Sequence, residues 1–300
     1  MSEELGPDAF TKPFQLTKSM HRDVYPAVDP TNPSLSAAGK VVLITGAGGG
    51  LGHAIARAWS TAGAEGIVLV GRNIEKLEQT ASILTAPTLV ATGSVCSEAD
   101  VEVIFAKAIE KFGKVDTVVN TASEGNHGTV AGSTALSAWW PDIETNLKGL
   151  YILLNRFITL TGGKGTFINL ISLAVGLLRP GISSYGISKL AASRLGEFID
   201  LEQPEIRYFS IHPGIVQAED GRGIVIDHFT PFAKDKQMLT GGYTLYLQKP
   251  EADFMRGGLM SVNWDVEEMK EHEKEIVEGN LLKLAFLNGN LGPDGHPWSH

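Results

Sequence analysis

Short apolar runs alternate with longer amphipathic stretches along most of this chain of 300 residues. The apolar runs are rich in β-branched side chains and are bounded by turn residues, which is typical of buried strands. We expect strands at 41–44, 66–70, 88–92, 115–119 and 166–171, and helices at 53–60, 73–84, 99–112, 139–161 and 184–200. This repeated order predicts a single α/β domain in three layers, with a doubly wound parallel sheet between two layers of helices.

The two ends of the chain have a different pattern. Residues 1–38 contain five prolines and no clean periodicity, so we expect an extended arm. Its aromatic residues should pack against the domain at 39–265. Residues 266–300 predict a charged helix followed by an irregular tail. Residues 217–238, before a turn expected at 239–243, are long for an α/β connection and predict either a lid over the substrate or a passive surface excursion.

A glycine-rich turn stands between the first expected strand and the first expected helix. It reads Thr45-Gly-Ala-Gly-Gly-Gly-Leu-Gly52, and its key positions are Thr45, Gly46, Gly50, Leu51 and Gly52. Glycines let the backbone approach a pyrophosphate, and a helix N-terminus favours the negative charge. The order of strand, turn and helix therefore favours the phosphate cradle of a Rossmann-type fold over an ordinary flexible turn.

The second expected strand is followed by Gly71-Arg72-Asn73. In dinucleotide folds an acidic residue near this point binds the ribose 2′-hydroxyl, whereas an arginine accommodates a 2′-phosphate. No acid stands there and Arg72 does, so we expect NADP(H) rather than NAD(H). The alternative is a surface arginine that merely precedes the next helix.

Three residues in the middle of the chain predict a proton-transfer site. Tyr185 and Lys189 are four residues apart, on one face of an expected helix, and Ser172 follows the strand before it. A nearby ammonium lowers the pKa of a phenol, which makes Tyr185 a usable acid or base. Taken alone, a Tyr-x-x-x-Lys pair is common in helices and is usually without a catalytic role.

Composition excludes several other classes of protein. The net charge of −9 and the pI near 5.4 argue against nucleic-acid or anionic-membrane partners, which need basic patches. One cysteine, Cys96, excludes an intrachain disulfide, and the eight histidines lack the spacing of a metal site. No signal peptide and no apolar run of about 18–20 residues are present, so we expect a cytoplasmic protein.

The linked motifs resemble the short-chain dehydrogenase/reductase family, over about residues 39–265, and are similar to its fungal members in small-molecule and secondary metabolism. The matching motifs are Thr45-Gly-x-x-x-Gly-x-Gly52, Asn120-Thr-Ala-Ser123, Asn146, Ser172, Tyr185-Gly-Ile-Ser-Lys189 and His212-Pro-Gly-Ile-Val216. The resemblance implies catalysis by Asn146, Ser172, Tyr185 and Lys189. Tyr185 would exchange the proton, Lys189 would also bind the nicotinamide ribose, Ser172 would hold the substrate oxygen, and Asn146 would support a water relay.

The resemblance also implies the remaining cofactor contacts and the assembly. Those contacts would come from Asn120, Ala122, Pro213, Gly214, Val216 and Gln217. The adenine would contact only the backbone of Ser94 and Val95, because the acidic residue that the family usually has there is missing. A homodimer or homotetramer would form through residues 146–161 and 184–200.

We therefore expect an NADP(H)-dependent ketoreductase or alcohol dehydrogenase that acts on a small polyketide-like or aromatic metabolite. Two alternatives remain open. The same scaffold and cofactor can perform non-redox chemistry, such as dehydration, epimerisation or cyclisation, or the protein can be a nucleotide-binding protein without catalytic activity.

Overall fold

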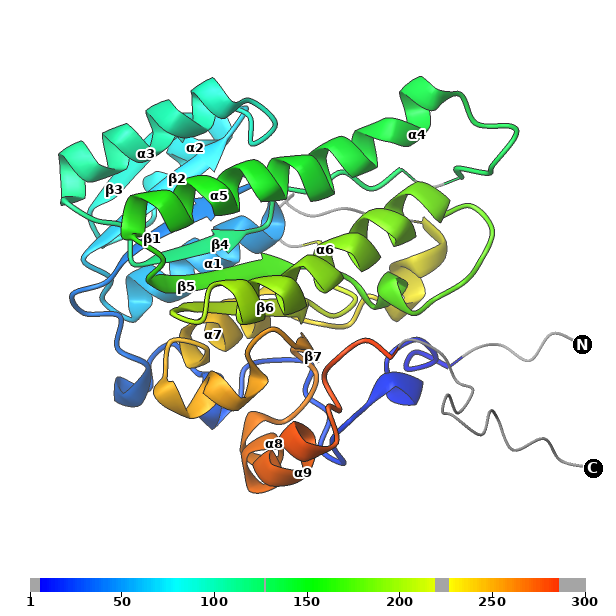
Figure 1. Ribbon diagram of the computed structural model, residues 1–300. Helices are drawn as coiled ribbons and strands as arrows, with labels where there is room; N and C mark the ends of the chain where they lie inside the picture. Colours follow the sequence, from blue (N-terminus) through cyan, green and yellow to red (C-terminus); the bar gives the residue numbers. More distant parts are fainter. Residues whose placement is uncertain (1–5, 127, 219–226, 286–300) are drawn as a thin grey trace, which may run out of the picture.

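The predicted doubly wound sheet is confirmed. A computed structural model describes residues 6–126, 128–218 and 227–285, and contains a seven-stranded sheet in the order β3-β2-β1-β4-β5-β6-β7 (Figure 1). Every neighbouring pair of strands is parallel. The strands are β1 (Val41–Thr45), β2 (Gly66–Gly71), β3 (Thr88–Thr92), β4 (Thr117–Asn120), β5 (Gly165–Leu170), β6 (Ile206–His212) and β7 (Leu259–Ser261).

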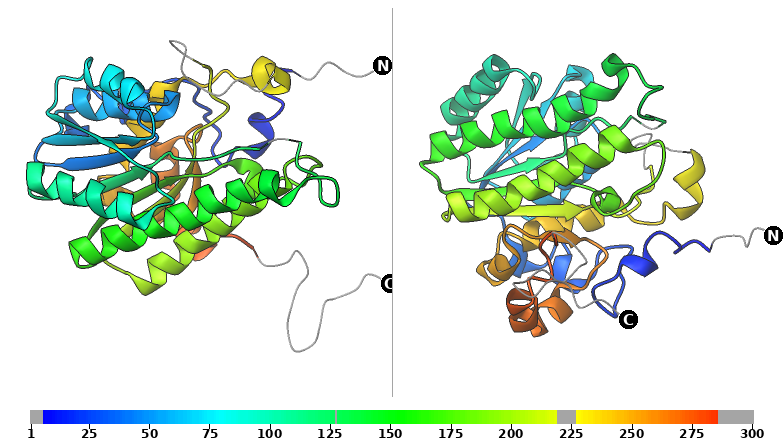
Figure 2. Two further views of the ribbon diagram at one scale, coloured as in Figure 1. Left: turned by 90° about the horizontal axis from the view of Figure 1, so that it is seen from above. Right: turned by 45° about the vertical axis from the view of Figure 1, so that its right-hand side comes forward.

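Helices cover both faces of the sheet, as Figures 1 and 2 show, which gives the three layers expected. One apolar core lies under α1 (Gly50–Thr61), α2 (Ile74–Ala81) and α7 (Gln237–Tyr246). The other lies under α3 (Glu98–Phe112), α5 (Leu150–Thr161) and α6 (Ser183–Glu202). The remaining helices are α4 (Leu136–Ile143), α8 (Val266–Glu271) and α9 (Glu273–Glu278). Within the described ranges, no helix is long and apolar enough to span a bilayer.

The N-terminal arm packs beside β7, α7 and α8 (Figure 1). The His21 ring stacks on the Tyr25 ring with centroids 3.6 Å apart. The backbone N–H of His21 donates to the Asn263 carbonyl oxygen (2.9 Å). The Trp264 indole N–H donates to the Phe14 carbonyl oxygen (2.9 Å). Backbone groups of the arm thus bind the segment that follows β7.

The prediction of a turn at 239–243 is wrong, because these residues lie inside α7. The two glycines that suggested a turn allow close packing instead. A Cβ on Gly241 would lie 2.8 Å from the Ala58 Cβ of α1, and one on Gly242 would lie 1.7 Å from the Val28 carbonyl oxygen. Glycine is needed at these two positions because α1 and the arm pack directly against the backbone of α7.

Other boundaries differ from the expectation as well, for example in three places. The helix expected at 139–161 is interrupted by a π-helical turn, Glu144–Gly149, which separates α4 from α5. The fourth strand begins two residues later than expected, at Thr117. The C-terminal helix is two short helices, α8 and α9, with His272 between them. Residues 219–226 of the expected lid and 286–300 of the expected tail lie outside the described ranges.

The glycine packing predicts a large loss of stability for Gly242→Ala. The added methyl overlaps the Val28 carbonyl, so either α7 or the arm has to move, at a cost of about 3 kcal/mol or more in the free energy of unfolding. Urea denaturation measures this loss. Gly176→Ala is the matched control, since its Cβ meets nothing within 4 Å. Equal stability of the two variants would contradict the packing argument.

Candidate active site

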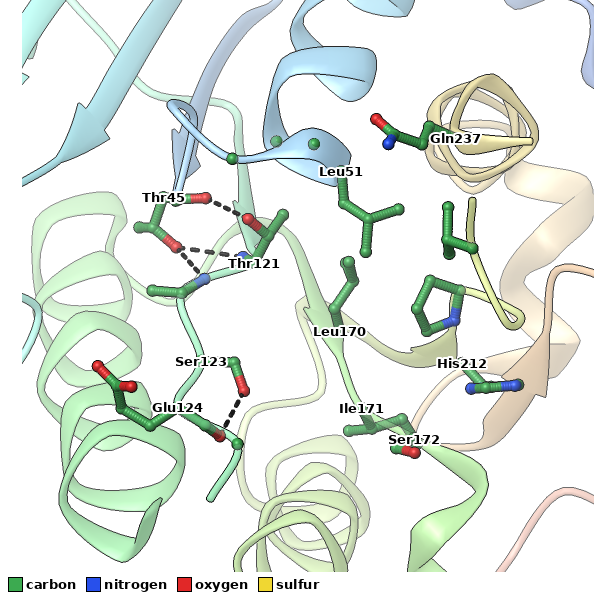
Figure 3. A pocket seen from close by; sticks show the side chains of 18 of the residues that line it. Thr45, Leu51, Thr121, Ser123, Glu124, Leu170, Ile171, Ser172, His212 and Gln237 are labelled. Atoms are coloured by element: carbon green, nitrogen blue, oxygen red, sulfur yellow. Dashed lines mark hydrogen bonds between the residues drawn. The ribbon is translucent and has the colours of Figure 1, made fainter. Parts of the chain in front are cut away.

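A cavity of about 1280 Å³ opens at the carboxyl ends of the strands, around the point where strand order reverses between β1 and β4 (Figure 3). Ligand pockets are usually about 300–1,000 Å³, so this volume has room for a dinucleotide and a second small molecule. Crevices at such reversals are where α/β sheets bind ligands.

The loop after β1 is held by its neighbour after β4. The Thr45 hydroxyl donates to Asn120 Oδ1 (2.6 Å) and accepts from the N–H groups of Thr121 (3.2 Å) and Ala122 (3.1 Å), part of which Figure 3 shows. The Thr121 hydroxyl donates back to the Thr45 carbonyl oxygen (2.6 Å). Asn120 also donates to Asn169 Oδ1 of β5 (2.8 Å). These bonds fix the floor of the cavity.

The glycine-rich turn has the shape of a phosphate cradle. Gly46 has φ of 65°, and a Cβ there would lie 2.5 Å from the Thr121 hydroxyl oxygen. A Cβ on Gly52 would lie 2.4 Å from the Gly46 carbonyl oxygen. The turn therefore folds tightly, and the first turn of α1, whose N–H groups have no partners within the helix, borders the cavity. Backbone donors at a helix N-terminus suit a pyrophosphate, so the residues present fit a dinucleotide.

Basic side chains lie at the end of the cavity beside β2. Arg72, expected to read a 2′-phosphate, is largely exposed and pairs with Glu124 Oε1 across the cavity (3.2 Å). Lys76, in the first turn of α2, lines the same region and was missed. The Ser94 N–H, expected to contact adenine, donates instead to Asp100 (2.8 Å), which leaves that backbone donor occupied.

Ser172, Tyr185 and Lys189 all line the cavity. Ser172 caps a short 3₁₀ turn just after β5, where its hydroxyl accepts from the Ala174 N–H (3.1 Å). Tyr185 lies in the first turn of α6, and hydrogen bonding connects it to Ser172. The buried ammonium of Lys189 donates to the Leu170 carbonyl oxygen (3.0 Å) and lies 5.7 Å from the Tyr185 ring centroid. The three groups expected to act together are therefore neighbours.

The pKa of Tyr185 moves opposite to our expectation. Burial raises the pKa of the phenol, the Ser172 hydrogen bond lowers it by less, and the charge of Asp142 raises it further. Burial also lowers the pKa of Lys189 to about 8, with Asp142 acting in the opposite direction. The reason is physical: both groups are buried, and desolvation disfavours the phenolate and the ammonium alike.

Asn146 lies beneath the cavity and does not line it. It stands in the π-helical turn, a distortion that is frequent at functional sites. Its Oδ1 accepts from the Ser123 hydroxyl and the Glu124 N–H (both 2.9 Å), and its Nδ2 donates to the Glu124 carbonyl and the Ser188 hydroxyl (both 2.9 Å). Ser188 donates in turn to the Tyr185 carbonyl oxygen (2.8 Å). A water relay through the Asn146 side chain would need one of these bonds to open.

Asp142 is a buried acid beside the site that the sequence did not reveal. Its side chain is fully buried and accepts from the Ser184 hydroxyl (2.6 Å) and from the backbone (3.1 Å) and side-chain amide (2.7 Å) of Asn126. Its position one helical turn before Asn146 was the only signal. Asp142 thus connects the start of α6, next to Tyr185, to the loop after β4.

The loop after β6 is held by a second buried acid, Asp235. The Ile215 N–H donates to its Oδ2 (2.5 Å), Asn263 donates to Oδ1 (2.8 Å), and Arg22 of the arm pairs with Oδ1 (3.0 Å). Gly214 has φ of 80°, and a Cβ there would lie 2.4 Å from Asp235 Oδ2. The arm therefore fixes a loop that lines the cavity.

A family model described as short chain dehydrogenase matches residues 40–224. The chain belongs to this family. It is 30% identical to the short chain dehydrogenase mpl6 of Monascus purpureus over 286 residues, covering 91% of this chain and 97% of that protein. It is 29% identical to the short chain dehydrogenase andI of Emericella variicolor over 284 residues, covering 90% and 95%.

A solved structure shares the fold. The 3-ketoacyl-(acyl-carrier-protein) reductase from Brucella melitensis, complexed with NADH, is similar with a TM-score of 0.66 and 25% identity, covering 76% of this chain and 97% of that one. The fold and the family expected from the motifs are therefore confirmed, and the chain is related to oxidoreductases.

In this short chain dehydrogenase, most of the residues expected at the site line one cavity. They are Thr45, Gly46, Gly50, Leu51, Gly52, Arg72, Ser94, Val95, Ala122, Ser172, Tyr185, Lys189, Pro213, Gly214, Val216 and Gln217. Asn120 and Asn146 are buried beneath it. Gln237 of α7, which no motif indicated, also lines the cavity and donates to the Gln217 carbonyl oxygen (2.9 Å).

The contacts of Asp142 predict that Asp142→Asn destabilises the short chain dehydrogenase by about 1–3 kcal/mol, because an amide NH₂ would face groups that are themselves donors. Thermal or urea unfolding measures the change. Glu144→Gln, which removes a half-exposed partner of Lys148, should cost about 0–1 kcal/mol. Equal losses for the two variants would show that Asp142 has no special structural role.

Proposed function

We propose that this short chain dehydrogenase is an NADP(H)-dependent ketoreductase or alcohol dehydrogenase. The observation that carries the proposal is the meeting of Ser172, Tyr185 and Lys189 in a cavity with a phosphate cradle. A cofactor of this class supplies or accepts the hydride when it is bound. The protein then has to orient the substrate and manage one proton.

Reduction is the direction that the side chains favour. As hydride reaches a carbonyl carbon, negative charge develops on the oxygen, and the Ser172 and Tyr185 hydroxyls can donate to it. Tyr185 then gives its proton to that oxygen. Because burial raises its pKa, Tyr185 holds this proton at neutral pH, as a general acid requires.

Lys189 and Asn146 have supporting roles in this proposal. The Lys189 ammonium stabilises the Tyr185 phenolate as it forms and binds the nicotinamide ribose. Asn146 fixes the π-helical turn and, through Ser188, the backbone of Tyr185. A water relay to Lys189 through Asn146 remains part of the proposal.

Preference for NADP(H) rests on Arg72 and Lys76, the two basic residues at the adenosine end of the cavity. Pairing with Glu124 holds Arg72 over the cavity and has to be exchanged for the 2′-phosphate. The Brucella reductase is described with NADH, so the two basic side chains are the specific support for NADP(H).

The substrate end supports an apolar metabolite with aromatic character. Phe10, Phe14 and Phe229 line it. We extend the proposal to a polyketide-like or aromatic carbonyl compound, to residues 217–238 as a cover over it, and to a homodimer or homotetramer through α5 and α6. Tyr151 of α5 and Phe198 of α6 are exposed, as such an interface requires.

Cofactor binding gives the first test. NADPH should quench the intrinsic fluorescence at lower concentration than NADH, and Arg72→Glu or Lys76→Glu should weaken NADPH binding about tenfold or more with little effect on NADH. Arg57→Glu, an exposed residue of α1 outside the cavity, controls for the change in net charge. Tighter binding of NADH would refute the NADP(H) preference and leave the reductase proposal standing.

Turnover gives the second test. The protein should oxidise NADPH in the presence of some member of a panel of aryl ketones and quinones, and Tyr185→Phe should lower this rate about 10²–10⁴-fold with NADPH binding intact. Conversion of a substrate without loss of NADPH absorbance would indicate non-redox chemistry. Binding without any chemistry would favour a nucleotide-binding protein.

The pKa of Lys189 predicts how the reduction rate depends on pH. Its pKa of about 8 means that the ammonium is present below pH 8 and is lost above it, so kcat/KM should fall up to tenfold per pH unit above this value. Tyr185 remains protonated in that range because its pKa is raised. Steady-state assays from pH 6 to 10 measure the profile. A rate independent of pH up to 10 would contradict this role of the ammonium.

A further inference from the structure

Three segments far apart in the sequence meet at the substrate end of the cavity. Phe10 belongs to the arm, Phe229 to the 3₁₀ segment Asp227–Phe232, and Arg179 to the loop between Ser172 and α6. The Phe10 and Phe229 ring centroids are 5.4 Å apart at 70°, and the Arg179 guanidinium carbon lies 5.3 Å from the Phe229 centroid. Phe10 also packs edge-on against Phe232 (4.7 Å). Phe10 and Arg179 therefore both lie against the Phe229 ring.

Arg179 differs from most arginines of the described chain. Carboxylates pair with Arg22, Arg72, Arg156, Arg194, Arg207 and Arg256. The exposed Arg179 guanidinium has no hydrogen bond or ion pair among residues 6–126, 128–218 and 227–285, and it lies over the Phe229 ring. Its donors are thus available to a ligand, while the ring holds the planar group in place.

The charge of the lining points to the same kind of ligand. The described lining contains the basic residues Arg72, Lys76, Arg179, Lys189, Lys234 and Lys236 but only one acid, Glu124, in a chain of net charge −9. A dinucleotide accounts for the first two and catalysis for Lys189. The Lys236 ammonium donates to Gln217 Oε1 (3.0 Å), and Arg179 and Lys234 remain at the substrate end without such a role. A cleft of one sign concentrates ligands of the other.

The arm holds Phe10 in this position. Arg22 pairs with Asp8, two residues before Phe10, and also with the buried Asp235. The Lys236 N–H donates to the Arg22 carbonyl oxygen (2.8 Å). Through Arg22, the segment that carries Phe10 is connected to Asp235, which also fixes the loop after β6. The Phe10 ring is therefore held in place as part of the cavity wall.

We propose that Phe10, Phe229 and Arg179 form a substrate subsite for an aromatic ring that carries a carboxylate. The inference rests on the proposed function and specifies its substrate class as aromatic carbonyl compounds with an acidic group. The rings pack against the aromatic part, and the Arg179 guanidinium donates two parallel hydrogen bonds to the carboxylate.

Binding of 2-naphthoate and of its neutral methyl ester tests the subsite. Titrations with the full chain at saturating NADP⁺, followed by calorimetry, should give a dissociation constant about tenfold lower for the acid than for the ester. Arg179→Gln should abolish this preference, and Arg179→Lys should keep part of it because one charge remains. Phe10→Ala should weaken acid and ester by a similar factor.

Arg57→Gln is the matched control, because it removes an exposed arginine outside the cavity and should leave the preference unchanged. Equal binding of acid and ester by the wild type, no binding of either, or a preference that survives Arg179→Gln would overturn the subsite. NADPH titration of each variant separates this from the proposed function. If the wild type binds NADPH but does not select the acid, only the subsite fails; if it binds no NADPH, the proposed function fails.

Discussion

The hydrogen bond from the Thr45 hydroxyl to Asn120 joins the two strands between which the order of the sheet reverses. The Asn120 amide in turn donates a hydrogen bond to Asn169 on the next strand. Three strand ends are therefore tied by buried polar side chains at one edge of the sheet. From these ends the chain continues into the glycine-rich turn, the Ala122–Glu124 segment and Ser172, so the spacing of the whole cavity depends on this short network.

Outside that network, two buried acids hold the walls of the cavity. Asp142 binds the loop after β4 to the start of α6, and Asp235 binds the loop after β6 to the arm. A buried carboxylate is costly unless donors surround it, and both acids have at least three. Each acid thus makes the position of a cavity loop depend on residues distant in sequence, which gives the site a rigid frame.

The local parts of this architecture could be predicted from the sequence, and the long-range parts could not. Strand runs and the glycine-rich turn depend on neighbours within a few residues, so the sheet and the cradle were recognised. Apart from the helical spacing of Asp142 from Asn146, Asp142 and Asp235 have no local pattern that separates them from surface acids, because their donors come from other elements. Gly241 and Gly242 suggested a turn, since the helices that need their small size are distant in sequence.

The pKa of Tyr185 illustrates the same limit at the site itself. The spacing of Tyr185 and Lys189 was correct, yet it does not reveal that both groups are desolvated or that the ammonium binds the Leu170 carbonyl oxygen. Burial disfavours phenolate and ammonium alike, and so the resting site retains a phenol beside an ammonium of reduced pKa. In the proposed reduction, such a pair gives a proton to the developing alkoxide. To act as a base, Tyr185 must first become a phenolate, which burial opposes, so proton donation is the easier direction for this group.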